Sequence, residues 1–193
     1  NMVQQESLSI ISGCSGIGKS WIALNMGLAI SGGTPLFGFF EVDKPRKVLM
    51  AQFELTNGQV KERVEILQNH YNQSWAAIGS NFDYVILDED NPSFTDRWEP
   101  LENLLSSGKY KGGVVIVDNL YTSVDADVDT SSNPDLIPVV SKWHEMMTKY
   151  EVAIVIITHH LKGRKRTPID HDDILGGATL TRFASNIFQI KNS

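Results

Sequence analysis

The stretch GCSGIGKS, residues 13–20, follows the apolar run 8–12 and precedes a segment with helical spacing, 19–31. It matches the pattern G-x-x-x-x-G-K-[ST], whose glycines let the backbone wrap closely around phosphate groups. The loop amides and the N-terminus of the next helix direct partial positive charge at the anion. Lys19 is expected to reach the β- and γ-phosphates, and the Ser20 hydroxyl to ligate Mg²⁺. The alternative is a glycine-rich turn that binds nothing. The expected nucleotide contacts are Gly13, Cys14, Ser15, Gly16, Ile17, Gly18, Lys19, Ser20 and Trp21.

Outside this loop, apolar runs alternate with helical patterns, which is typical of an α/β fold with a mostly parallel central sheet flanked by helices. The expected strands lie at 8–12, 47–53, 82–87, 114–118, 152–158 and 186–190, with 82–87 at an edge. The expected helices lie at 19–31, 57–71, 97–106 and 134–150. Polar segments at 121–133 and 161–173 are expected to be loops, the first acidic and mobile, the second basic in its first half. Since no linker or repeat interrupts this pattern, we expect a single domain over residues 1–193.

Composition narrows the class of protein. The net charge of −6 and the pI of about 5.3 disfavour a protein that binds duplex DNA over its whole surface. A single cysteine, Cys14, excludes an internal disulfide and a multi-cysteine metal site. The longest apolar runs are too short to span a bilayer, and no signal peptide is recognisable. We therefore expect a cytoplasmic protein with no membrane partner, and interpret Asn1, which precedes Met2, as the remnant of a tag.

Two carboxylates follow buried strands. Asp118 ends the aliphatic run 114–117, as expected for a residue that holds Mg²⁺ through a water molecule; the alternative is an Asp that caps a turn. Glu54 follows the strand expected at 47–53, where ligands bind in open α/β sheets. A carboxylate there can orient and polarise an attacking water. Alternatively, Glu54 only starts the next helix.

Several motifs together resemble the RecA-like ATPase core, most closely the RepA-type replicative helicases of plasmids and mobile elements. Their order and spacing are more specific than any one of them, and they extend over nearly the whole chain. The matching segments are 13–20, 48–54 with Arg63, 114–120, 157–163 and 175–180.

The resemblance implies an ATP hydrolase that uses ATP and Mg²⁺ and assembles into a homo-oligomeric ring, with six subunits as one option. It implies that Glu54, 35 residues after Lys19, is the catalytic glutamate. It also implies a γ-phosphate sensor at His159 or His160, with His160 preferred, whereas the residues alone favour solvated loop histidines. Arg63 resembles an arginine that lies near the adenine, and a solvated helix face is the equal alternative.

The sequence departs from the family pattern in two places. RepA-like proteins commonly offer an arginine to the neighbouring subunit just before the last motif, where this chain has Leu175. Arg182, Arg164 and Arg166 are the nearby candidates for that arginine finger. The family core also continues with further strands after Ile190, so we expect either a shortened domain or a reduced relative.

The sequence therefore leaves several functions open. A helicase-like motor for DNA replication is favoured by the basic cluster Lys162, Arg164, Lys165 and Arg166, which a ring would repeat around its pore to bind single-stranded DNA. The acidic loop 121–133 argues against DNA if it faces the same pore, and the main alternative is a KaiC-like, ATP-dependent switch without DNA. A nucleotide-binding module with little turnover, and a small-molecule kinase, are the remaining alternatives.

Overall fold

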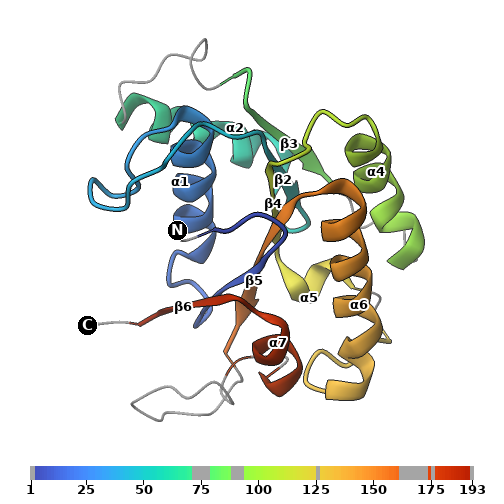
Figure 1. The fold of residues 1–193 in the computed structure, drawn as a ribbon. Coiled ribbons are helices and arrows are strands. Elements are labelled where there is room, and N and C mark those ends of the chain that lie inside the picture. Colours follow the sequence, from blue (N-terminus) through green and yellow to red (C-terminus); the bar gives the residue numbers. More distant parts are fainter. Residues whose placement is uncertain are drawn as a thin grey trace.

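The computed structural model describes residues 3–70, 79–87, 94–124, 127–160, 174 and 177–191. Within these residues, six strands form one sheet in the order β3-β2-β4-β5-β1-β6, and every pairing is parallel. Figure 1 shows this sheet at the centre of the molecule. The strands are β1 (Leu8–Gly13), β2 (Val48–Gln52), β3 (Phe82–Ile86), β4 (Val114–Asp118), β5 (Ala153–His159) and β6 (Asn186–Ile190).

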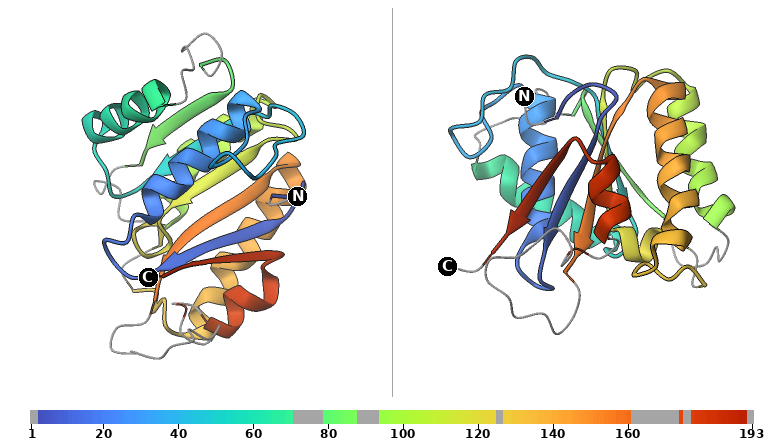
Figure 2. Two further views of the ribbon diagram at one scale, coloured as in Figure 1. Left: turned by 90° about the vertical axis from the view of Figure 1, so that its left-hand side faces the viewer. Right: turned by 60° about the horizontal axis from the view of Figure 1, so that its bottom comes forward.

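Helices cover both faces of the sheet, as the views in Figure 2 show. One face carries α1 (Lys19–Gly32) and α2 (Asn57–His70). The other carries α4 (Phe94–Ser106), α5 (Leu120–Ser123) and α6 (Asn133–Tyr150), and α7 (Gly177–Phe183) packs against α6. Among the described residues, no helix has the length and apolar character needed to cross a membrane.

Alternate residues of each inner strand enter opposite cores. In β2, Leu49 and Ala51 pack with the core under α4 and α6, whereas Val48 and Met50 pack with the core under α1 and α2. A strand that is buried on both faces needs apolar residues at every position, not at every second one. This is why the inner strands are continuous apolar runs in the sequence.

The expected α/β class is confirmed, and all six expected strands and four expected helices are present with small shifts at their ends. The loop expected at 121–133 is wrong at its start, because Leu120–Ser123 form the short helix α5. Asn119 starts that helix by accepting a hydrogen bond from the Thr122 backbone N–H through its side chain. Helix α7 was not expected either. The basic segment 161–173 and Leu175 lie outside the described residues.

The strand order determines where a ligand can bind. Strands β1 and β2 are consecutive among the strands of the chain, but β5 and β4 lie between them in the sheet. The carboxyl ends of β2, β4, β5 and β1 therefore lie side by side at one edge. Gln52 is in register with Asp118, and Gly13 with His159. Open α/β sheets bind ligands at this edge, where the strand order reverses.

Candidate active site

A cavity of about 280 Å³ opens at the carboxyl edge of the sheet. Its wall combines the loop after β1 with residues at the carboxyl ends of β2, β4 and β5, and with Arg63 of α2. The charged and polar side chains that line it include Lys19, Ser20, Glu54, Arg63, Asp118 and His159. Residues that are far apart in the sequence thus meet in one place, and most of them are the residues expected from the sequence.

The loop 13–20 has the backbone conformation that its glycines allow. Gly16 has φ of 76° and Gly18 has φ of 94°, in the left-handed region that other residues rarely adopt. Gly18 caps α1 without a side chain that could satisfy the first amides of the helix. These amides, together with the positive end of the 14-residue helix α1, form a cradle for an anion.

Lys19 is the first residue of α1 and is buried beneath the loop. Its ammonium group donates to the carbonyl oxygens of Gly13 (3.1 Å) and Cys14 (2.8 Å), and lies 3.2 Å from Nδ1 of His159. Burial lowers the pKa of Lys19, while the negative charges of Asp118 and Glu54 oppose that shift. Three polar contacts therefore fix the ammonium group between the loop carbonyls and His159.

Asp118 is buried, with only 1% of its surface exposed. Its Oδ2 accepts a hydrogen bond of 2.9 Å from Nε2 of Gln52, but its Oδ1 has no hydrogen-bond partner among the described residues. Burial raises the pKa of Asp118, while the hydrogen bond from Gln52 and the nearby Ser20 hydroxyl oppose the shift. A buried carboxylate oxygen without a partner is costly. A hydrated Mg²⁺ would satisfy it, and the Ser20 hydroxyl lines the same cavity. The residues present therefore fit Mg²⁺.

Glu54 lies just beyond the end of β2, at the rim of the cavity. Its side chain is exposed, and its backbone N–H donates to Oε1 of Gln52 at 3.0 Å. Its charge influences both Lys19 and Asp118, so the carboxylate lies within electrostatic reach of the phosphate and metal positions. This position suits a residue that orients water, and the catalytic role of Glu54 stays a prediction.

The two histidines at the end of β5 occupy different environments. His159 lines the cavity, with Nδ1 facing Lys19 and Nε2 lying 3.4 Å from the side-chain amide nitrogen of Asn119. His160 is not among the residues that line the cavity, and its Nδ1 lies 3.9 Å from Sγ of Cys14. The resemblance implies a sensor at His160 before His159, whereas the geometry favours His159. A neutral imidazole has one acceptor nitrogen, so His159 can accept from Lys19 or from Asn119 but not from both.

Arg63 reaches the cavity from α2. Its guanidinium group lies 5.2 Å from the centre of the Trp21 ring, a cation–π distance, and both side chains line the cavity. A flat, partly apolar surface of this kind suits a nucleobase or its ribose. The other candidate arginine in the described residues, Arg182, is exposed on α7 and does not line the cavity.

Gln52 and Asn119 are two residues of the site whose roles the sequence does not indicate. Gln52 is fully buried between Asp118 and the turn that carries Glu54, and Asn119 lies between His159 and α5. The signal that could have revealed Gln52 is a single large polar residue in the apolar strand VLMAQF. Asn119 stands beside Asp118 and follows the same strand.

The parallel sheet, the phosphate-binding loop after β1 and the buried aspartate at the end of β4 define a P-loop nucleoside triphosphatase with a RecA-like fold. Residues 1–165 match the family described as AAA domain, and the chain belongs to that family. Membership indicates ATP binding and hydrolysis, for which the family generally uses Mg²⁺. No curated protein was found to match the chain.

Proposed function

We propose that this chain hydrolyses ATP as the motor domain of a ring-forming, RepA-like replicative helicase. The observation that carries the ATPase part is the convergence of Lys19, Asp118 and Glu54 on one cavity at the carboxyl edge of the sheet. The motor part rests on the order of the sequence motifs and on the basic segment at 162–166.

The residues divide the chemistry among themselves. The loop amides and Lys19 bind the β- and γ-phosphates and stabilise the negative charge that develops there. Ser20 and Asp118 would hold Mg²⁺, and the bound ion would neutralise charge at the phosphates. Glu54 orients the attacking water and accepts its proton. Trp21 and Arg63 contact the nucleoside.

An arginine from a neighbouring subunit completes the proposed site. Among the described residues, Arg63 is the only arginine that lines the cavity, and it stacks on Trp21. An arginine finger typically contributes about 10³-fold or more to the rate. Specific activity should therefore rise with protein concentration as rings form, with light scattering as the parallel measure of assembly. A specific activity that is flat from nanomolar to high micromolar protein would contradict a shared site.

Single-stranded DNA is the proposed track of the motor, bound through Lys162, Arg164, Lys165 and Arg166. Binding should fall steeply with salt, with a slope of about −0.7 per phosphate contact, because each contact releases counterions. The measurement is fluorescence anisotropy of a labelled strand with a non-hydrolysable ATP analogue across a salt series. The variant Arg164→Ala/Lys165→Ala/Arg166→Ala should bind more weakly and with a shallower slope.

A matched control removes the same charge elsewhere. Lys61, Lys111 and Lys149 are exposed residues on other parts of the surface, and their triple replacement by Ala should leave DNA binding close to that of the parent. If both triple variants bind as well as the parent with the same slope, the basic segment is not the DNA contact.

A KaiC-like switch without DNA is the second candidate, and one observation favours it. His159 lies between Lys19 and Asn119, and Asn119 also caps α5. A phosphate that draws Lys19 away would leave His159 to accept from Asn119, and so connect the nucleotide state to α5. Steady ATP turnover that single-stranded DNA does not stimulate would favour this switch, whereas the absence of turnover would favour a passive nucleotide-binding module.

A further inference from the structure

We propose that Gln52 is a positioning residue that ties the carboxylate of Asp118 to the backbone carrying Glu54, so that the metal side and the water side of the site move as one unit. This inference rests on the ATP hydrolysis proposed above and adds to it a role for Gln52, which lies in the matching segment 48–54 but to which the sequence gives no role.

Gln52 contacts both Asp118 and the turn that follows β2. Its side chain is fully buried at the end of β2. Nε2 donates to Oδ2 of Asp118 at 2.9 Å, while Oε1 accepts from the backbone N–H groups of Glu54 (3.0 Å) and Leu55 (3.3 Å). One amide therefore joins the end of β4 to the turn after β2.

The orientation of this amide is determined by its partners. Turning it over would direct NH₂ at two backbone donors and direct the carbonyl oxygen at a carboxylate, which loses all three hydrogen bonds. Among side chains of this length, Met offers no hydrogen bond, and Glu would place a second carboxylate against Asp118. Glutamine thus satisfies both neighbours at once, which explains a polar residue in an otherwise apolar strand.

The bridge has a consequence for each side of the site. Gln52 occupies Oδ2 of Asp118, so that Oδ1 is the carboxylate oxygen without a hydrogen-bond partner among the described residues. By holding two consecutive amides, it fixes the turn from which the exposed side chain of Glu54 extends. Residues that orient metal ligands and catalytic groups in this way typically change metal affinity or activity by about 10- to 100-fold when they are replaced.

The first test requires no nucleotide. The swap Gln52→Glu/Asp118→Asn exchanges donor and acceptor: the new amide can donate to the new carboxylate, whose second oxygen can still accept from the two backbone amides. We expect Gln52→Glu alone to lower the melting temperature by several degrees, and the double variant to recover most of that loss. Asp118→Asn alone completes the cycle, which isolates the pairwise interaction. Losses that simply add in the double variant would overturn the bridge.

A matched control shows that recovery is specific. Gln68, on α2, is a second buried glutamine and does not line the cavity. Gln68→Glu should also lower the melting temperature, because it buries a charge, but adding Asp118→Asn to it should restore nothing. Equal recovery in both pairs would mean that Asp118→Asn stabilises the protein generally, and would also overturn the bridge.

The second test separates positioning from a structural role. Gln52→Met keeps the size of the side chain and removes its hydrogen bonds. We expect kcat to fall about 10- to 100-fold, and the Mg²⁺ concentration that gives half of the maximal rate to rise. The KM for ATP should stay within about threefold of the parent value. Gln68→Met should leave all three quantities close to the parent values. Parent-like kcat and Mg²⁺ dependence in Gln52→Met would overturn the positioning role.

The two tests distinguish a failure of the proposed ATP hydrolysis from a failure of the role proposed for Gln52. If the parent hydrolyses no ATP under any condition, the proposed function fails, while the nucleotide-free cycle still decides whether the bridge exists. If Gln52→Met does not fold, the same cycle of Gln52→Glu and Asp118→Asn variants still decides whether the bridge between Gln52 and Asp118 exists. If the parent is active and the cycle shows no coupling, only the role of Gln52 is overturned.

Discussion

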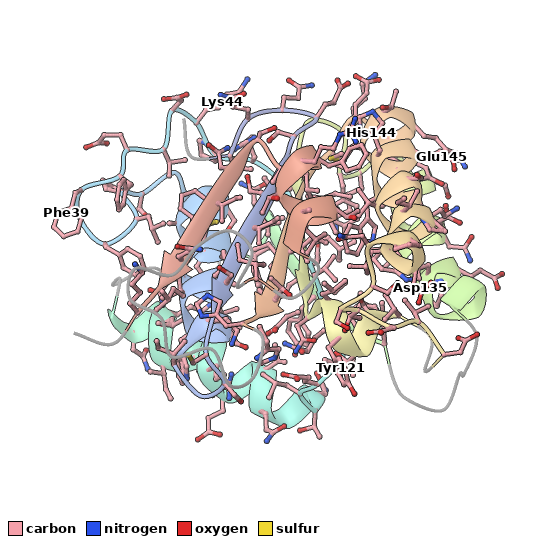
Figure 3. The ribbon with its side chains drawn as sticks, turned by 90° about the horizontal axis from the view of Figure 1, so that it is seen from below. Phe39, Lys44, Tyr121, Asp135, His144 and Glu145 are labelled. Atoms are coloured by element: carbon pink, nitrogen blue, oxygen red, sulfur yellow. The ribbon has the colours of Figure 1, made fainter. Side chains whose placement is uncertain are left out.

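Helix α1 connects two cavities of similar size. At its N-terminus lies the cavity of about 280 Å³ that contains Lys19, Asp118 and the glycine-rich loop. Towards its C-terminus a cavity of about 220 Å³ is lined by Met26 and Ile30 of the same helix. Beside the second cavity a tight turn presents Phe39, which is 76% exposed and projects from the molecule in Figure 3.

The two cavities at the ends of α1 differ in which hydrogen-bonding groups lack a partner. The first cavity contains the uncapped amides of α1 and a buried carboxylate oxygen without a partner among the described residues. At the other end, Gly33 closes the helix by donating its N–H to the carbonyl of Ala29, and apolar side chains line the cavity together with the charged residues Glu41, Asp43, Lys44 and Arg46. A cavity becomes a candidate for chemistry when polar groups converge on it without being satisfied, and volume alone does not distinguish the two.

The largest expected effect is that of Lys19→Ala. The substitution removes the positive charge that contacts the β- and γ-phosphates. ATP affinity should therefore fall more than tenfold, and turnover should be lost. Isothermal titration with a non-hydrolysable ATP analogue and Mg²⁺ measures the affinity. If the variant keeps micromolar affinity, the polar cavity is not the phosphate site, and the contrast between the two ends loses its basis.

The second prediction concerns the rim of the same cavity. Glu54→Gln keeps the shape of the side chain and removes the base, so turnover should fall by roughly 10²-fold or more while ATP binding is retained. Single-turnover hydrolysis, measured beside equilibrium binding, separates the two quantities. Glu62→Gln, at an exposed position on α2, is a matched control that should behave like the parent. Unchanged turnover in Glu54→Gln would leave Glu54 as a residue that only precedes a helix.

This contrast between the two ends was only partly predictable from the sequence. Residues 13–20 predict their own structure, because a contiguous loop needs only local geometry to bind phosphate. Asp118 and Glu54 were found because each follows a strand, and parallel strands bring their carboxyl ends to one edge. Gln52 was missed because its role depends on two partners that the fold, not the sequence, places beside it. Choosing between His159 and His160 likewise required the register of β5 with β1.

The third prediction uses the unsatisfied carboxylate itself. Because burial raises the folded-state pKa of Asp118 above its ordinary value of 3.8, the folded protein holds that proton to higher pH than the unfolded protein does. This group's contribution to stability is therefore fully present below the ordinary pKa, and is lost as pH rises through the raised one. Asn does not titrate, so the stability of Asp118→Asn relative to the parent should increase with pH.

Chemical denaturation of parent and Asp118→Asn at pH 4, 5.5 and 7, without nucleotide or Mg²⁺, measures that difference. Any fixed cost of the new amide is the same at every pH and cancels when the differences are compared. A relative stability that does not change with pH would mean that Asp118 is already compensated. In that case the carboxylate would not distinguish this end of the molecule from the other.

The smallest expected effect is at the opposite end, with Phe39→Ser. The ring of Phe39 is largely exposed and has an edge-on contact with Phe40, at 6.0 Å between ring centres. A surface substitution of this kind typically changes stability by no more than about 0.5 kcal/mol. Turnover, ATP affinity and Mg²⁺ dependence should stay within about twofold of the parent, since no described contact joins this turn to the polar cavity. Steady-state kinetics at several protein concentrations is the measurement, because a ring contact made through Phe39 would lower activity only where rings form. A tenfold loss at every concentration would show instead that the two ends of α1 are coupled, and that the end beside Phe39 takes part in catalysis.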